Sequence, residues 1–488
     1  MGKWGIALVA GFCLAMGAAV TPAKAQVDVD AFIRKDKFGS IKLSPSGEFY
    51  AASVPLEDRT AFAVMRRSDR KLTTSFALGK NVHVANFWWV SDGRVLFSVE
   101  EKYGSLDEPF ATGELFAVGA EGGAPEMLVG YRVADRGPGT RIQPKTAENV
   151  SAFLVDPLTS DSRNVIVSIW PWNREPFSRA ERMDIYTGRR VTLARAPVAR
   201  ADFTTDHQGV VRFALGSGSD NVRKLYYRAG ADSEWELIND EAVSGRVETP
   251  VGFSSDDTRV YLTVEQTSGP DVIVEMDVAT KARKDVFRND NVDPAAIIVS
   301  NQFKPVPVGA LFVDGKPRTE FFDGTDEMAR LYRSLEAVFP GESVTVTSST
   351  ADGRLSLIRV DSDRNPGDFY VFDTETKKAD YLVGRRDWLD PAQLAEARPI
   401  RLKARDGLEL HGYVTLPPGA GDGPRAMVVL PHGDRSRYGI GGDSTTKCRC
   451  LRQPATLYCR STSVAPTVMA VPSRRLAPGN GAEPCRMI

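Results

Sequence analysis

The sequence predicts a mainly β fold, in which an N-terminal β-propeller of about seven blades precedes the first strands of an α/β domain. Three observations support this prediction. A turn that contains Gly or Asp recurs at a steady spacing, apolar residues alternate with polar ones after each turn, and the chain changes character after Gly433. The length of 488 residues leaves room for more than one domain.

The first 25 residues have the features of a secretory signal peptide. Lys3 supplies a positive charge, residues 6–20 form a short apolar stretch, and Ala23-Lys24-Ala25 fits a small-x-small cleavage site. A transmembrane anchor is the alternative, but the apolar run is too short for a good span. We therefore expect a periplasmic or secreted protein whose folded part begins near residue 26.

Residues 26–395 carry the repeat that predicts the propeller. Strands with period-two alternation, such as 95–99 and 260–264, follow turns that favour tight hairpins. The turns recur about every 47 residues, which is enough for a four-stranded blade. An array of β-sandwiches is the alternative, but the even spacing favours a propeller. The clearest copies of the turn lie at 43–47, 89–93, 203–206, 253–257 and 350–353.

One helix is predicted within the last-but-one blade. Asp326 can cap it, and Pro340-Gly341 ends it. Its apolar face is expected to pack against the propeller and consists of Met328, Leu331, Leu335 and Val338. We expect the aromatic pair Trp88-Trp89 to belong to a blade core rather than to a substrate platform. The histidines His83, His207 and His411 are expected to be structural or solvated.

A second domain begins after a connector. Residues 387–391 and 396–399 form the connector, and 404–408 contain a hairpin signal. The continuous apolar run at 426–430 is typical of a strand buried on both faces of a mostly parallel sheet. It ends at Pro431-His432-Gly433.

These segments resemble the S9 (prolyl oligopeptidase) family of serine peptidases, in its acylaminoacyl-peptidase and dipeptidyl-aminopeptidase branch. The resemblance is carried by Ala-Arg-Asp-Gly at 404–407, Gly-Tyr-Val-Thr-Leu-Pro at 412–417 and Val-Val-Leu-Pro-His-Gly at 428–433. Residues 363–370 also look like the end of that branch's propeller. The resemblance implies that residues 396–433 start an α/β-hydrolase domain.

The resemblance further implies a Ser-Asp-His triad that cleaves short peptides, with the serine in a Gly-x-Ser-x-Gly elbow. The loop after His432 and Gly433 would help to form the oxyanion site. Residues 434–488 contain neither that motif nor any histidine. We therefore expect His432 and Gly433 to be a remnant of the oxyanion loop and expect no catalytic residue, metal site or cofactor.

Residues 434–488 differ from the rest of the chain and are expected to be an aberrant, disordered tail. No cysteine occurs from 26 to 447, yet the tail has Cys448, Cys450, Cys459 and Cys485. No histidine follows at a zinc-finger spacing, so these cysteines do not indicate zinc. A genuine divergent C-terminus is one interpretation, but it leaves the sudden cysteines unexplained.

A frameshift after Gly433 explains the tail better. If the codons for residues 440–445 are read from their third base, they can encode Arg-Trp-Gly-Phe-Asp. In the same shifted frame, the codons from 480 onward can encode Gln-Trp and then Met-Pro-Asp-Asp-Leu. Between these two segments, the codons for residues 460–471 can encode Phe-Asn-Phe-Arg-Gly-Ser-Asn-Gly-Tyr-Gly-Gly in that frame. These strings, in one frame and in order, resemble the family's continuation, although codon degeneracy makes each match weak by itself.

Two functional hypotheses follow. The first is a truncated, inactive S9 peptidase whose intact relatives act on short peptides. The second is a stand-alone propeller that binds peptides or a protein partner. The net charge of −1 gives no reason to expect nucleic acid or a membrane surface as a partner. The sequence leaves the oligomeric state and the substrate specificity of the intact relative open.

Overall fold

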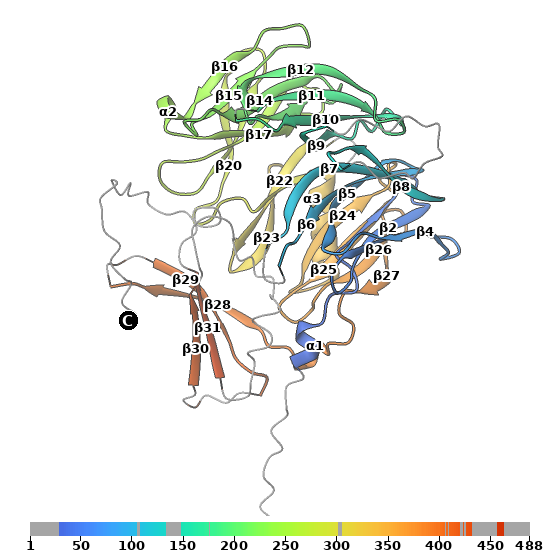
Figure 1. The fold of residues 1–488 in the computed structure, drawn as a ribbon. Coiled ribbons are helices and arrows are strands. Elements are labelled where there is room, and N and C mark those ends of the chain that lie inside the picture. Colours follow the sequence, from blue (N-terminus) through green and yellow to red (C-terminus); the bar gives the residue numbers. More distant parts are fainter. Residues whose placement is uncertain are drawn as a thin grey trace, which may run out of the picture.

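The computed structural model describes residues 29–104, 108–132, 148–174, 176–300, 305–405, 407, 409–419, 423, 426–431 and 456–462. The expected signal peptide and the remnant residues His432 and Gly433 lie outside these ranges. Within them the chain forms a ring of small sheets and one further sheet beside the ring (Figure 1). None of the helices in the described part is long and apolar enough to cross a lipid bilayer.

Seven consecutive sheets form the blades of a β-propeller, as the repeat predicts. Each blade is built from one continuous stretch of chain, and its strands are antiparallel and hydrogen-bonded in sequence order. The first strand of each blade lies innermost, since β1 contacts β24, and β13 contacts both β9 and β17.

Blades 1 to 3 contain β1 (Ser40–Leu43), β2 (Phe49–Pro55), β3 (Thr60–Arg66), β4 (Leu72–Ala77), β5 (Val82–Ser91), β6 (Arg94–Glu101), β7 (Phe110–Gly119), β8 (Gly122–Val129), β9 (Val150–Asp156), β10 (Asn164–Pro171), β11 (Phe177–Asp184) and β12 (Arg190–Ala199). Blades 4 and 5 contain β13 (Asp202–Thr205), β14 (Val211–Ser217), β15 (Arg223–Tyr227), β16 (Glu236–Asp240), the short helix α2 (Glu241–Ser244), β17 (Glu248–Phe253), β18 (Arg259–Val264), β19 (Val272–Asp277) and β20 (Arg283–Arg288). Blades 6 and 7 contain β21 (Ala296–Val299), β22 (Pro307–Asp314), β23 (Lys316–Phe321), α3 (Glu327–Val338), β24 (Ser343–Ser349), β25 (Leu355–Asp361), β26 (Asp368–Asp373) and β27 (Lys378–Gly384).

The recurring turns join the first and second strands of the blades, and those of blades 1 and 7 share one backbone geometry. In blade 1 the amide of Gly47 donates to the carbonyl of Ser44 at 2.9 Å, and in blade 7 the amide of Gly353 donates to Thr350 at 2.9 Å. Both glycines have a left-handed φ, 73° and 72°. Glycine adopts this conformation without the steric cost that a side chain brings, which explains why the turn recurs with Gly in the sequence.

Apolar side chains fill the spaces between neighbouring blades, because the alternating strands turn their apolar residues toward the adjacent sheet. Between blades 1 and 2 the rings of Phe62 and Phe97 lie 5.8 Å apart, and Phe87 meets Phe62 edge-on at 5.1 Å. Trp89 is buried in the same cluster, and Trp88 packs against the cluster between blades 2 and 3. The expectation that both tryptophans belong to blade cores is confirmed.

The ring closes by side-chain packing and hydrogen bonds between blades 1 and 7, without exchange of strands. Ile41 and Leu43 of β1 pack against Leu357 and Phe369 of blade 7. The amide of Leu43 also donates to the Ser348 hydroxyl at 2.8 Å. The two ends of the propeller are therefore held together by contacts that a local change can weaken.

Blade 6 has three strands, and helix α3 follows the third, so the prediction of a helix in this blade is confirmed. Asp326 caps the helix by accepting a hydrogen bond from the amide of Met328 at 2.8 Å. Leu335 is fully buried against blade 7. The predicted apolar face is wrong at Val338, which is 61% exposed. The buried face of the helix is rotated from the predicted one and consists of Ala329, Tyr332 and Leu335.

The C-terminal sheet has the strand order β28-β29-β31-β30. It follows the short 3-10 turn η1 (Pro391–Gln393) and contains β28 (Ala397–Lys403), β29 (Glu409–Thr415), β30 (Ala426–Pro431) and β31 (Thr456–Thr462). The β28–β29 hairpin matches the predicted turn at 404–408. The connector expected at 396–399 is in fact strand from residue 397 onward, since its backbone pairs fully with β29.

Two expectations about this sheet differ from the structure. Strand β31 comes from the segment in which we expected no regular structure, and it pairs antiparallel with β29 and parallel with β30. β30 therefore has one parallel neighbour. The side chains of Met427, Val428 and Val429 are exposed rather than buried on both faces, because β30 is the edge strand and no described element covers it.

Candidate active-site region

One face of the propeller carries the start of every first strand, and we call it the entry face. Since the strands of a blade alternate in direction, the turn between the second and third strands and the link to the next blade also lie on this face. The chain leaves the last propeller strand, β27, on the entry face as well. The C-terminal sheet is therefore attached there.

The C-terminal sheet contacts the entry face at blade 6. The hydroxyl of Tyr413 in β29 donates to the carbonyl of Gly315, in the turn between β22 and β23, at 2.6 Å. Arg401 of β28 forms an ion pair at 3.0 Å with Asp314, the last residue of β22. Figure 1 shows the sheet beside β23. These contacts fix one side of the sheet against the rim of the propeller.

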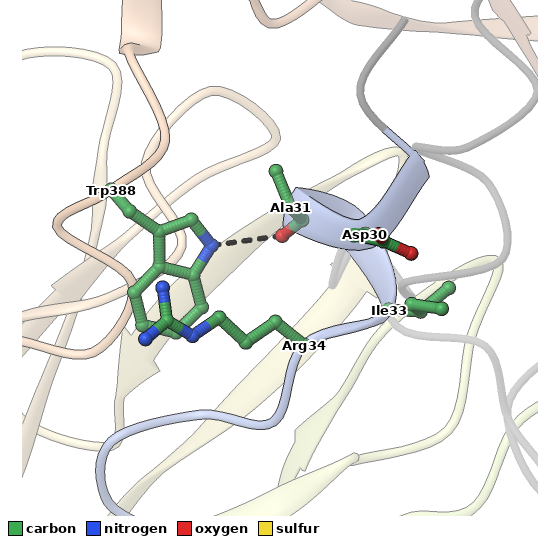
Figure 2. A pocket seen from close by; sticks show the side chains of 5 residues that line it. All are labelled: Asp30, Ala31, Ile33, Arg34 and Trp388. Carbon is green, nitrogen blue, oxygen red and sulfur yellow. Dashed lines mark hydrogen bonds between the residues drawn. The ribbon is translucent and has the colours of Figure 1, made fainter.

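The linker to this sheet also holds the N-terminal segment, at helix α1 (Val29–Ile33). The indole nitrogen of Trp388 donates to the carbonyl of Ala31 at 2.8 Å, and the guanidinium of Arg34 lies 4.7 Å from the indole ring (Figure 2). Asp36 forms ion pairs with both Arg385 and Arg386. The two segments that connect the propeller to the rest of the chain are thus tied together beside the blade 1–blade 7 junction.

The predicted remnant of the oxyanion loop follows β30 directly. β30 and β31 are parallel, so their carboxyl ends lie at the same edge of the sheet. Open α/β sheets place their ligands outside the carboxyl ends of parallel strands. Because β30 ends at Pro431, the chain reaches His432 and Gly433 from this edge; their own positions, and any role in an oxyanion site, lie outside the described residues.

The three described histidines are structural, as expected from the sequence. His207 pairs with Asp257 at 2.6 Å and joins blades 4 and 5. His411 lies 3.3 Å from Glu409, within the C-terminal sheet. The ring of His83 lies 3.2 Å from the hydroxyl of Thr60.

The Thr60–His83 contact is a hydroxyl–imidazole pair that sequence reasoning missed, because the two residues come from different blades. It does not form a nucleophilic centre. Thr60 is buried, so its hydroxyl has no route to a substrate. Burial, with a smaller contribution from Lys35, also lowers the pKa of His83. The pair acts as a contact between blades 1 and 2.

Burial moves the pKa values of two other groups, Lys42 and Asp271, toward neutrality. Burial lowers the pKa of Lys42 to about 8, and its ammonium donates to the amide oxygen of Asn86 at 3.1 Å. Burial, together with the nearby carboxylate of Asp293, raises the pKa of Asp271 to about 7. Neither group contacts a described serine, threonine or histidine that could act as its catalytic partner. Across the described ranges, no three His, Cys, Asp or Glu side chains are placed to hold a metal ion.

We compared the chain with family models, with curated proteins and with solved structures. No family model matches the chain. The chain is 25% identical over 272 residues to dipeptidyl aminopeptidase BIII of Pseudoxanthomonas mexicana, a match that covers 54% of this chain and 39% of that protein. The chain therefore spans well under two thirds of the length of this relative.

Solved structures of the same fold belong to peptidases and a related hydrolase. Prolyl oligopeptidase B from Galerina marginata matches with a TM-score of 0.57 and 10% identity, over 89% of this chain and 63% of that one. Puromycin hydrolase matches with a TM-score of 0.55 and 14% identity, over 90% and 69%. The acylaminoacyl peptidase of Pyrococcus horikoshii gives 0.52 and 11%, over 89% and 66%.

Proposed function

We propose that this chain, which belongs to the S9 (prolyl oligopeptidase) family of serine peptidases, is the propeller-bearing portion of a peptidase that acts on short peptides. One relative with clear sequence similarity is a dipeptidyl aminopeptidase. We further propose that it is exported to the periplasm or secreted, as the sequence of residues 1–25 predicts.

The order of the C-terminal sheet is the observation that carries this proposal. A hairpin, β28–β29, is followed by β30 and then by β31, which inserts between β29 and β30 and runs parallel to β30. A parallel neighbour requires a crossover connection, and residues 432–455 are long enough to supply one. An antiparallel hairpin that leads into parallel strands is a suitable start for an α/β-hydrolase sheet.

In the sequence as printed, we propose that the polypeptide is catalytically inactive. Residues 434–488 contain no Gly-x-Ser-x-Gly and no histidine, so they supply neither a nucleophile elbow nor a base. The shifted reading of 460–471 contains a family-like Asn-Phe-Arg-Gly-Ser string. That string overlaps the end of β31, the strand parallel to β30. A frameshift after Gly433 accounts for both observations.

A stand-alone binding propeller is not favoured. The C-terminal sheet docks on blade 6 through Tyr413 and Arg401, which is the arrangement expected of a second domain that works with the propeller.

Active-site labelling tests the proposed inactivity. We expect the purified chain to take no label from a fluorophosphonate probe and to hydrolyse no aminoacyl or dipeptidyl anilide. Removing the members of a triad leaves only a small residual rate over water. Stoichiometric labelling of a single serine in the folded protein would show that the chain assembles a nucleophile from residues we have not assigned.

A further inference from the structure

Exposed aromatic side chains gather at one place on the propeller. They lie in blades 2 and 3, where strands begin or end on the entry face. Tyr103 is 79% exposed and follows β6, and Trp172 is 50% exposed and follows β10. We call this group, together with the half-buried Tyr131, the aromatic rim; its members are Tyr103, Phe110, Tyr131, Trp172 and Phe177.

The members of the aromatic rim from the two blades lie close together. Tyr103 stacks on Phe110 with ring centroids 5.0 Å apart, and Tyr131 lies 4.9 Å from Trp172. Tyr131 follows the last strand of blade 2, and its contact with Trp172 joins the two blades. Its neighbour Arg132 pairs with Glu101, which lies two residues before Tyr103. Single exposed apolar residues are normal, whereas a contiguous group marks a binding surface.

Ion pairs hold this surface in place. Arg132, which follows Tyr131 in the chain, pairs with both Glu101 and Glu114, and its guanidinium lies 5.3 Å from the Tyr131 ring. Glu114 is fully buried and also accepts a hydrogen bond from Thr112 at 3.0 Å. Two carboxylates and one guanidinium leave one net negative charge beneath the rings. The position of Tyr131 is therefore fixed before anything binds, and the net charge of this cluster disfavours an acidic side chain next to it.

The position of the aromatic rim indicates what covers it. The C-terminal sheet docks on the entry face at blade 6. In a ring of seven, the junction of blades 2 and 3 lies directly across the channel mouth from blade 6. The aromatic rim and the carboxyl ends of β30 and β31 thus belong to the same side of the propeller, where a substrate of the proposed peptidase would be held.

We propose that the aromatic rim binds the apolar side chains of peptide substrates, so that the substrate class is non-acidic oligopeptides rich in aromatic and aliphatic residues. This inference rests on the proposed function and adds the substrate class to it. Tyrosine and tryptophan faces bury large apolar area and lose little conformational freedom when they bind, since each ring is set by two side-chain torsions.

Peptide binding to the full chain tests this proposal without any need for catalysis. The probes are three fluorescein-labelled, end-blocked octapeptides. One alternates Phe and Leu with Ser, one alternates Ala with Ser, and one is the first with two Ser changed to Glu. We expect the first to bind most tightly in fluorescence anisotropy. The Ala and Glu peptides should each bind at least about fivefold more weakly.

Matched variants locate the site. Tyr103→Ala and Trp172→Ala should each weaken binding of the Phe/Leu peptide at least about fivefold, which is about 1 kcal/mol. Tyr186→Ala is the control, because Tyr186 is an exposed aromatic of blade 3 in the turn between β11 and β12, on the opposite face. It should change affinity less than twofold. Circular dichroism and melting curves confirm that each variant is folded.

The proposal is overturned if the full chain binds the three peptides equally, or if Tyr186→Ala weakens binding as much as the rim variants. These results leave the family function intact if a frame-restored protein is active. Conversely, selective binding at the aromatic rim together with an inactive frame-restored protein would contradict the proposed function and keep the rim as a peptide-binding surface.

Discussion

Replacing Asp36 by Asn should weaken the closure of the propeller. Asp36 lies in the N-terminal segment, and its carboxylate pairs with Arg385 and Arg386 of the linker, about 350 residues away in the chain. Its side chain is 15% exposed, and that of Arg386 is 12% exposed. Since blades 1 and 7 share no strand, these ion pairs act directly on the junction that closes the ring. Asn keeps the shape of the side chain and removes the charge.

The size of the effect follows from burial. Breaking a fully buried ion pair costs about 3–5 kcal/mol, and an exposed pair contributes about 0–1 kcal/mol. For this largely buried cluster we expect a loss of about 2 kcal/mol. With an unfolding entropy of about 2.1 cal/mol/K per residue over about 370 residues, that loss lowers Tm by about 3 °C.

Urea and thermal unfolding of the full chain measure the loss at the Asp36 cluster. Asp69→Asn is the matched control, because Asp69 is 49% exposed and pairs with Arg66 within one hairpin. It should leave the urea and thermal unfolding curves nearly unchanged, because an exposed ion pair contributes little to stability. Equal melting curves for Asp36→Asn and the wild type would refute the reasoning. The apolar cluster of Ile41, Leu43, Leu357 and Phe369 would then close the ring without the ion pairs.

Two further predictions concern pH and association. The pKa of Asp271 is raised to about 7 in the folded protein, so the stability contributed by its protonated form is present below about pH 4 and lost as the pH rises through about 7. Asp271→Asn should therefore have the same free energy of unfolding as the wild type near pH 4 and a larger one, by about 1–2 kcal/mol, at pH 8. This difference is smaller than the full pKa shift would give, because solvent partly screens the carboxylate. Equal free energies of unfolding at pH 8 in urea titrations would contradict the prediction. Val429→Lys places a charge on the exposed edge strand β30 and should lower light scattering by the concentrated protein. Val191→Lys, at an isolated exposed valine of β12, should change scattering much less, and an equal change would show that β30 is not the associating surface.

Much of the propeller is visible in the sequence because its determinants are local. Turn residues such as Gly47 and Gly353 set the backbone at the same place in blades 1 and 7, and period-two alternation marks the strands of the blades. The capping residue Asp326 and the breaker Pro340-Gly341 likewise define α3 from neighbouring residues. Such signals act over a few residues and need no knowledge of the ring.

Features that depend on distant pairs were not predictable from one sequence. The ion pairs of Asp36 and the contact of Thr60 with His83 join residues from different blades or chain ends. Helical spacing suggested Val338 as a core residue, but the buried positions depend on where blade 7 lies against α3. The apolar run of β30 indicated a strand and not its exposure, which depends on the elements that cover the sheet.

The candidate site was predictable only in part, for the same reason. The family resemblance at 404–433 lies in the segment that contributes β29 and β30 to the C-terminal sheet. The aromatic rim carries no such motif, because Tyr103 and Trp172 lie in separate blades and gather only at the entry face. The alternation of apolar and polar residues predicts which face of a strand is buried. It does not predict which ends of strands from different blades lie close together.

We propose that this sequence derives from an S9 peptidase whose catalytic segment is out of frame after Gly433. The direct measurement is fluorophosphonate labelling of the folded product of a gene corrected by one nucleotide near codon 433. We predict labelling of one serine in a Gly-x-Ser-x-Gly motif, together with hydrolysis of aminoacyl or dipeptidyl substrates, while the uncorrected chain shows neither. A corrected protein that folds, contains the Asn-Phe-Arg-Gly-Ser segment and remains unlabelled and inactive would contradict the account.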